Sequence, residues 1–307
     1  MGAFLGFDTS NYTTSVALFE NGSFFQRKKL LPVKVGERGI RQSDAVFHHT
    51  KAYPYLVEDL FSERGCSEIK AVGASVTPTT QEGSYMPCFL VGEAAARSFA
   101  AINGIPFYSF SHQQGHIAAA LYSSGRTELL EKRFLAFHVS GGTTDLILCE
   151  PDEKNIFKTT LVGSSSDLKA GQAIDRIGVK MGLSFPAGAG VEALALKSDR
   201  VFKNKIKLVD GRCSLSGLEN KALKMLEDGE SKEDVSKFLL SYIADAVSEM
   251  TSDAFRKLGE LPVVFAGGVM SDVIIRDIIL SRFDAAFAEP EFSCDNAAGI
   301  AYLTSIK

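Results

Sequence analysis

Two histidines four residues apart, His112 and His116, form the segment with the clearest potential for chemistry. Ser111 before them and Gln114 three residues later fit a capping box, which predicts that a helix begins here. Side chains at positions i and i+4 of a helix share one face, where two neutral imidazoles can bind one metal ion. The alternative is a structural pair of partly buried histidines that hydrogen-bond to the backbone, and the spacing alone leaves both open.

The residue after the first histidine argues against a zinc protease. In such enzymes a Glu follows the first histidine directly and acts as the general base. Here the position is Gln113, and an amide cannot take a proton from water. A metal at this helix would hold phosphate or carbonyl oxygens instead.

Two pairs of glycines follow apolar runs and could bring bare backbone close to an anion. The first pair ends a predicted strand, where a tight hairpin turn is the alternative. The second pair follows the run 262–266 and precedes a helix predicted from Ser271, whose N-terminus would lie beside a ligand. Close packing of helix on sheet is the alternative there. The candidate phosphate or nucleotide contacts are Ser140, Gly141, Gly142, Thr143, Gly267 and Gly268.

A third candidate site lies on a predicted helix that runs to Ile177. Asp167, Gly171 and Asp175 recur at four-residue spacing on one face of it. The two carboxylates could bind ribose or substrate hydroxyls. Ordinary surface acids are the alternative.

The chain contains a repeat that should position these groups. Residues 4–19 reappear at 134–149 with a constant offset, and each copy has the pattern strand, polar turn, strand. The repeat predicts two homologous lobes, each with a hairpin tip that could contact phosphate; two unrelated core hairpins are the alternative. In the first copy the candidate contacts are Asp8, Ser10 and Asn11, and we expect the second, glycine-rich copy to be the main phosphate site.

Strands and helices alternate along the rest of the chain, which indicates an α/β fold with mixed sheets. The basic stretch 28–41 lacks periodicity, and 163–167 has the composition of a polar loop. The predicted helices are 44–64, 92–102, 231–258 and 295–305, and the predicted strands are 69–76, 105–110 and 262–266.

The bulk composition limits the function classes. The chain has 307 residues, and no stretch approaches the roughly 18 apolar residues that a membrane span needs. A net charge of −4 does not suggest a nucleic-acid binder, although 26–41 and 203–207 are locally basic. Five scattered cysteines without a CxxC pair favour reduced thiols and a cytoplasmic location.

Ordered motifs along almost the whole chain resemble one family. They are FDTSNYTTSVAL, SHQQGHIAAAL, VSGGTTDLIL, AGQAIDRIGVKMGL, CSLSGLENK, FAGGVMSD and FSCDNAAGIAYL. Together they are similar to the TsaD/Gcp family, the tRNA threonylcarbamoyl transferases once described as sialoglycoprotein endopeptidases. The resemblance implies the two-lobed actin/Hsp70/sugar-kinase (ASKHA) fold with a duplicated hairpin-bearing lobe and a central nucleotide cleft. We expect an N-terminal lobe at 1–127 and a C-terminal lobe at 128–307, with the last helix packing back on the first lobe.

The resemblance also implies roles for individual residues. His112, His116 and Asp295 match the metal ligands, for one ion of Fe or Zn. The serine and glycines of the two glycine segments match phosphate and nucleotide contacts, for ATP, ADP or an acyl-adenylate. Asp167 and Gly171 match the helix that lines the substrate pocket, and Asp167 is the candidate catalytic residue. The implied reaction moves a threonylcarbamoyl group from threonylcarbamoyl-AMP to the adenosine 3′ to the anticodon of ANN-decoding tRNAs.

Several positions depart from the family pattern. Residues 77–83 replace a GPG segment, Leu168 replaces the second Asp of an Asp pair, and Gln172 replaces a Glu. Asp272 replaces an Asn after the second glycine pair, where a carboxylate close to a phosphate would repel it. The pattern is that of a diverged paralogue that keeps the metal triad.

The leading hypothesis is therefore a metal- and nucleotide-dependent acyltransferase that modifies tRNA together with TsaB-like and TsaE-like partners. The alternative is a non-catalytic, nucleotide-binding scaffold of a tRNA-modification complex. Carbamoylation of a small molecule fits less well, because the long accessory domain of such enzymes is absent, and a peptidase fits least.

Overall fold

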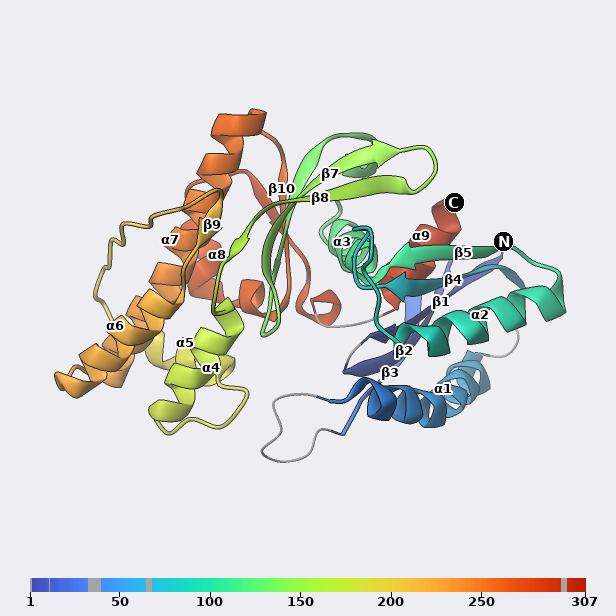
Figure 1. Ribbon diagram of the computed structural model, residues 1–307, viewed down its shortest axis with the longest axis horizontal. Helices are drawn as coiled ribbons and strands as arrows, with labels where there is room; N and C mark the ends of the chain where they lie inside the picture. The colour runs from blue at the N-terminus through green and yellow to red at the C-terminus, as the bar shows by residue number, and fades with distance from the viewer. Residues whose placement is uncertain (1, 11, 33–39, 65–67, 294–296) are drawn as a thin grey trace. The chain divides into compact units, whose positions relative to one another are not determined.

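The computed structural model describes residues 2–10, 12–32, 40–64, 68–293 and 297–307 (Figure 1). Contacts divide the chain into two compact units. The first comprises Met1–Thr127, Asp152–Lys158 and Cys294–Lys307, and the second comprises Glu128–Pro151 and Thr159–Ser293. Among the described helices, none is long and apolar enough to cross a membrane.

The first unit is built on a five-stranded sheet in the order β3–β2–β1–β4–β5. Strand β1 pairs antiparallel with β2 and parallel with β4. The strands are β1 (Ala3–Ser10), β2 (Thr13–Glu20), β3 (Ser23–Leu30), β4 (Ile69–Thr77) and β5 (Phe107–Ser111). The helices are α1 (Gln42–Arg64), α2 (Phe89–Asn103), α3 (His112–Ser123) and α9 (Ala298–Ile306).

Helices cover both faces of this sheet, α1 and α2 on one side and α9 with α3 on the other (Figure 1). Because side chains alternate along a strand, Phe7 faces Tyr53 of α1 while its neighbour Gly6 faces α9. A side chain at Gly6 would meet the backbone nitrogen of Ala301 at 2.5 Å. Glycine therefore lets the C-terminal helix lie directly on β1.

The second unit has a six-stranded sheet in the order β11–β10–β6–β7–β8–β9, packed against the long helix α7 and the shorter helices around it. The strands are β6 (Phe134–Val139), β7 (Thr144–Asp152), β8 (Ile156–Ser165), β9 (Arg212–Cys213), β10 (Val263–Ala266) and β11 (Ala285–Phe287). The α-helices are α4 (Ala170–Lys180), α5 (Gly188–Ala195), α6 (Ser216–Glu227), α7 (Lys232–Leu258) and α8 (Val273–Leu280). Short 3-10 turns are η1 (Thr127–Glu131), η2 (Gly268–Ser271) and η3 (Pro290–Phe292).

The two sheets share one topology. Strands β8–β7–β6–β10–β11 of the second unit follow the order of β3–β2–β1–β4–β5 in the first. The two hairpins also pair in the same register, since Asp8 faces Ser15 and His138 faces Asp145, and the two pairs are one repeat apart in the sequence. The predicted duplication of a hairpin-bearing lobe is confirmed.

Four strands were not predicted: β3, β8 and the short strands β9 and β11. Lys28–Leu30, in the stretch without periodicity, belong to the edge strand β3, whose exposed face carries basic residues instead of an alternating pattern. The predicted loop at 163–167 was wrong at its start, because Gly163–Ser165 complete β8. Gly163 is buried there, close to Gly211 and Met250, where a larger residue would not fit. Helix α4 consequently begins at Ala170.

Candidate functional site

The histidine pair of the first unit lies at the start of α3, as predicted. The capping box is present: Gln114 N donates to Ser111 Oγ at 3.1 Å, and Ser111 N donates to Gln114 Oε1 at 2.9 Å. The Gln114 side chain also donates to the carbonyl of Phe157 at 2.9 Å. These contacts fix the first turn of α3, and with it the direction of both imidazoles.

The two imidazoles point their outer nitrogens at each other. His112 Nε2 and His116 Nε2 are 3.0 Å apart. On the other edge of its ring, His112 Nδ1 lies 3.0 Å from Asp8 Oδ1. Asp8 comes from β1, is fully buried, and also accepts a hydrogen bond from Ser75 of β4.

This arrangement fits a metal ion. Two nitrogens bound to one tetrahedral ion at about 2.1 Å lie about 3.4 Å apart, close to the observed separation. A carboxylate on Nδ1 sets the tautomer that leaves Nε2 as the ligand atom. Asp8 Oδ2 is buried and accepts no hydrogen bond within the described residues, so a nearby cation would stabilise this carboxylate.

The third ligand implied by the resemblance, Asp295, lies outside the described residues. Among the residues that are described, no group of three His, Cys, Asp or Glu could hold a metal ion. Asp295 precedes α9 by three residues, and α9 begins against the first turn of α3. There a side chain at Gly299 would collide with the carbonyl oxygen of Gly115, so only glycine permits this approach.

The strand ends beside the turn of the first hairpin are buried, and the hydroxyls of Thr9 and Thr14 contact the rest of the unit. Thr9 Oγ1 donates to Cys88 O at 2.9 Å, and Thr14 Oγ1 lies 2.8 Å from His49 Nδ1. Ser10, a predicted phosphate contact, is also buried. Asn11, another, lies outside the described residues. The structure thus places Asp8 against His112, and the described strand ends Asp8–Ser10 and Thr13–Ser15 are buried.

The tip of the second hairpin is open. Gly141 and Gly142 are exposed, and a Cβ at either would have no atom within 4 Å. Ser140 N donates to Thr143 O at 2.8 Å, which closes the turn. The N–H groups of Gly142 and Thr143 donate to Ser140 Oγ, each at 3.2 Å, so an anion bound there would compete with that hydroxyl.

Two further segments contact the same hairpin. Gly171, at the start of α4, donates to Ser140 O at 3.2 Å, and a side chain at Gly171 would collide with Gly141 N at 2.7 Å. Gly267 has φ +98°, and a Cβ there would collide with Val139 O. The structure therefore brings together the predicted glycines 141, 171 and 267 around one helix N-terminus. Bare amides beside a helix start suit a phosphate.

Asp167 forms hydrogen bonds to a neighbouring segment. Its carboxylate accepts from Ser214 Oγ and Ser216 Oγ at 2.7 Å each, and from Leu215 N at 2.8 Å and Leu168 N at 2.7 Å. Burial raises its pKa, but these hydrogen bonds outweigh burial and hold the pKa well below the usual range. Asp167 is therefore ionised, and its hydrogen bonds hold residues 214–216 in place. No spacing in the sequence indicates that Asp167 contacts residues 214–216.

Asp175 and Asp272 also serve local structure. Asp175 Oδ1 accepts from Ala187 N at 2.7 Å, and Asp272 Oδ1 caps α8 by accepting from Ile275 N at 3.0 Å. Burial raises the pKa of Asp272 to about 6, and the charge of Glu192 adds to the effect. With a pKa of about 6, Asp272 is still mostly ionised at neutral pH, so it would repel a phosphate placed close to it.

Sequence reasoning missed Ser75 and Thr144. Ser75 donates to Asp8, and Thr144 Oγ1 accepts from Ala170 N at 3.0 Å, which ties α4 to the second hairpin. Parallel pairing of β1 with β4 brings the carboxyl ends of both strands to one edge of the sheet. That rule, applied to the predicted strand 69–76, is the signal that could have found Ser75.

A family model described as TsaD, tRNA N6-adenosine threonylcarbamoyltransferase, matches residues 28–302. The chain belongs to this family. The tRNA N6-adenosine threonylcarbamoyltransferase of Thermus thermophilus is 31% identical over 97% of the chain and 90% of that protein. Its namesake from Prochlorococcus marinus is 29% identical over 98% of the chain and 89% of that protein. The chain is thus a transferase of the tRNA-modifying class, and the protease alternative is not supported.

Solved structures show the same fold at low identity. Full-length HypF in its phosphate- and nucleotide-bound form has a TM-score of 0.61 at 12% identity, covering 99% of the chain and 55% of HypF. A ROK family glucokinase from Streptomyces griseus, in complex with glucose and AMPPNP, has a TM-score of 0.54 at 12% identity, covering 99% of both chains. The predicted ASKHA fold is confirmed.

Proposed function

We propose that the chain transfers a threonylcarbamoyl group from threonylcarbamoyl-AMP to the exocyclic amine of the adenosine 3′ to the anticodon, and that it requires one ion of Fe or Zn. The observation that carries the metal requirement is the convergence of His112 Nε2 and His116 Nε2 beside the buried Asp8. His112, His116 and Asp295 would hold the ion. When bound, the ion supplies Lewis-acid stabilisation of charge on a phosphate or carbamoyl oxygen.

The residues of the chain contribute by positioning the reacting groups. The adenosine amine attacks the carbamoyl carbon, loses a proton, and AMP departs, so no nucleophilic side chain is needed. Asp8 orients His112 through Nδ1. Asp167 is a positioning residue, because its hydrogen bonds hold residues 214–216 in place.

The adenylate phosphate would bind at the second hairpin. Gly141 and Gly142 expose backbone there, the start of α4 provides a helix N-terminus, and Gly267 and Gly268 let backbone approach. The nucleotide-bound form of HypF and the AMPPNP complex of the glucokinase, which share this fold, support ATP, ADP or an acyl-adenylate as the ligand class. Action in the cytoplasm with TsaB-like and TsaE-like partners belongs to the same proposal.

The test is reconstitution with threonine, bicarbonate, ATP, an adenylate-forming enzyme and unmodified tRNA, with and without TsaB-like and TsaE-like proteins. Mass spectrometry of the digested tRNA measures the modified nucleoside, and elemental analysis measures the metal. We expect product with wild type and a loss of at least about 100-fold with His112→Ala/His116→Ala.

His48→Ala is the matched control. His48 lies on α1, and no hydrogen bond among the described residues joins it to His112 or His116. This variant should leave the product and the metal unchanged. Absence of product from wild type, with nucleotide still bound and partners present, would favour the scaffold alternative. Equal product from the double variant would remove the metal requirement.

A further inference from the structure

A row of lysines lies on one side of an extended segment in the second unit, remote in sequence from both candidate sites. From 201 to 209, exposed and partly buried residues alternate strictly. Phe202, Ile206 and Leu208 pack against the core, while Lys203, Lys205 and Lys207 are exposed. In an extended chain, side chains two residues apart lie on one side about 6.5 Å from each other.

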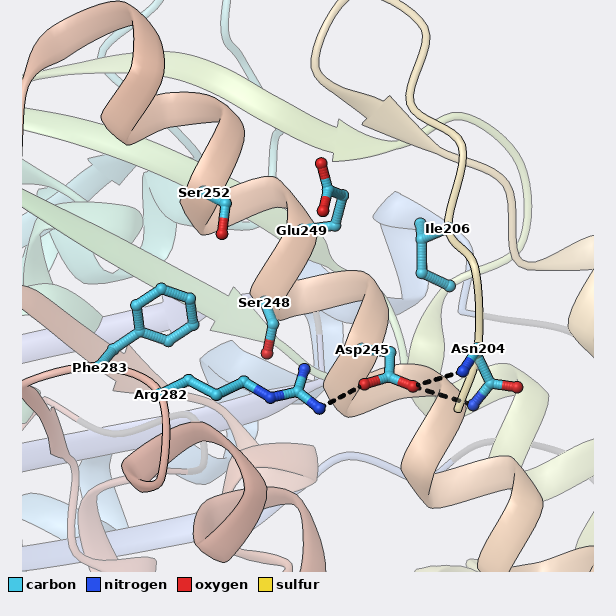
Figure 2. A pocket seen from close by; sticks show the side chains of 8 residues that line it. All are labelled: Asn204, Ile206, Asp245, Ser248, Glu249, Ser252, Arg282 and Phe283. Atoms are coloured by element: carbon cyan, nitrogen blue, oxygen red, sulfur yellow. Dashed lines mark hydrogen bonds and ion pairs between the residues drawn. The ribbon is translucent and has the colours of Figure 1, made fainter. Parts of the chain in front are cut away.

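A buried carboxylate fixes this segment to α7. Asp245 accepts from Asn204 N and from Asn204 Nδ2, both at 3.0 Å, and from Arg282 Nη2 at 2.7 Å (Figure 2). Asn204 is thereby held inward, so its neighbours Lys203 and Lys205 must project outward. Within the described part of the chain, no carboxylate forms an ion pair with any lysine of the row.

A polar cavity of about 350 Å³ lies on the inner side of the same segment, between it, α7 and residues 282–283 (Figure 2). Ser248 lines it, and its buried hydroxyl has no hydrogen-bond partner among the described residues. Arg282 and Phe283 provide a guanidinium group and an aromatic ring. Because Asp245 and Glu249 also line the cavity, it suits an uncharged ring with hydrogen-bonding edges better than a phosphate.

We propose that this face of the second unit binds single-stranded RNA. Lys203, Lys205 and Lys207 contact successive backbone phosphates, and the cavity takes one unpaired base. In a chain with a net charge of −4, a nucleic acid needs such a local cluster of cations. Unpaired bases are what proteins read in RNA, through hydrogen bonds to their edges and contact with aromatic rings.

The identity of the RNA rests on the proposed function. We take the bound strand to be an unpaired segment of the tRNA substrate. The two proposals can fail separately. Transfer depends on His112 and His116, whereas RNA affinity depends on the lysine row. His112→Ala should therefore abolish transfer and leave tRNA binding unchanged.

The experiment measures the affinity of the purified chain for an unmodified tRNA transcript over a range of salt concentrations. Lys203→Glu/Lys205→Glu/Lys207→Glu should weaken binding by about tenfold or more and reduce the salt slope by about 2, because three phosphate contacts are lost. The control Lys132→Glu/Lys180→Glu/Lys224→Glu makes the same change of charge at lysines outside the row. It should weaken binding much less.

The cavity is tested with a short single-stranded RNA and the same RNA with one abasic position. Wild type should prefer the intact strand several-fold, and Ser252→Leu, in the lining of the cavity, should abolish that preference. The lysine variant should weaken both strands alike. Thermal melting checks that each variant is folded.

Three results would overturn the inference. They are no tRNA binding by wild type, equal losses in the lysine variant and its control, and unchanged tRNA binding with weakened binding of an acidic protein partner. Failure of transfer alone, with these binding results intact, would overturn only the proposed function.

Discussion

The hairpins β1–β2 and β6–β7 have the same strand register and different environments. At the first tip, Asp8, Thr9 and Thr14 are buried and hydrogen-bonded within the unit. At the second, Gly141 and Gly142 are exposed, and a Cβ at either would make no close contact. Duplication thus preserved the backbone while the surroundings diverged: Asp8 of the first hairpin contacts His112, whereas the second hairpin exposes the backbone of two glycines.

The comparison is sharpest at the equivalent threonines Thr14 and Thr144. Thr14 Oγ1 contacts His49 of α1, whereas Thr144 Oγ1 accepts from Ala170 N and so attaches a helix N-terminus to the hairpin. The Thr14 hydroxyl contacts a side chain, whereas the Thr144 hydroxyl contacts a backbone N–H. Replacement of Thr144 should therefore loosen the start of α4, whereas replacement of Thr14 should affect the contact with His49.

The largest effect is expected at the backbone contact of the second hairpin. Gly267→Ala should destabilise the protein by about 3 kcal/mol or more, because its Cβ would collide with Val139 O and its φ is +98°. Gly268→Ala is the control, since a Cβ there has open space, and it should cost less than about 1 kcal/mol. Denaturant unfolding measures both, and similar costs would contradict the assignment of backbone support to this hairpin.

The next effect concerns Asp8 in the first hairpin. Asp8→Asn keeps the shape but loses the charge that orients His112, so metal affinity should fall about 10- to 100-fold. Competition with a chelator measures it. Nucleotide affinity should stay the same, and an equal loss of both would show that the two hairpins are not functionally separate.

A smaller effect concerns His49, which supports the first hairpin. Burial lowers its pKa to about 4 from an unfolded value near 6.5, so the unfolded chain binds the proton more readily. The stability that depends on neutral His49 is present above pH 6.5 and is lost as the pH falls from there towards 4. His49→Gln should flatten the unfolding free energy over this range. A variant with the wild-type pH dependence would refute the assignment.

The smallest effect has the opposite sign and lies in the second unit. Burial raises the pKa of Asp272 to about 6, so its contribution to stability is largest below the unfolded pKa of 3.8 and is lost as the pH rises through 6. Asp272→Asn keeps a capping side chain and should stabilise the protein by about 1 kcal/mol at pH 7.5, and by less at pH 5. Thermal melting at the two pH values tests this, and an equal change at both would contradict it.

The sequence predicted those features that depend on local pattern or on repetition. The capping box at Ser111 and Gln114 and the duplicated hairpin are present, and the helix predicted over 231–258 is α7, at 232–258. The contact between Asp8 and His112 spans 104 residues, and no local spacing reports it. Strands β3 and β8 were missed because an edge strand and a glycine-containing strand lack the alternation that identifies strands.

Which polar groups form hydrogen bonds within the chain also could not be predicted. Ser140, Thr9 and Asp167 have the residue types of ligand contacts, yet their oxygens form hydrogen bonds within the chain. Which hydroxyl remains available depends on neighbours brought in by tertiary packing. Residue type therefore indicated the location of the candidate sites better than the task of each side chain.

The central claim is that the first hairpin orients a metal-binding histidine pair while the second forms a separate nucleotide site. The most direct test measures metal content and nucleotide affinity in the same samples of wild type and His112→Ala/His116→Ala. We predict about one Fe or Zn per wild-type chain, none in the double variant, and nucleotide still bound by both. Equal metal content in the two proteins would contradict the account.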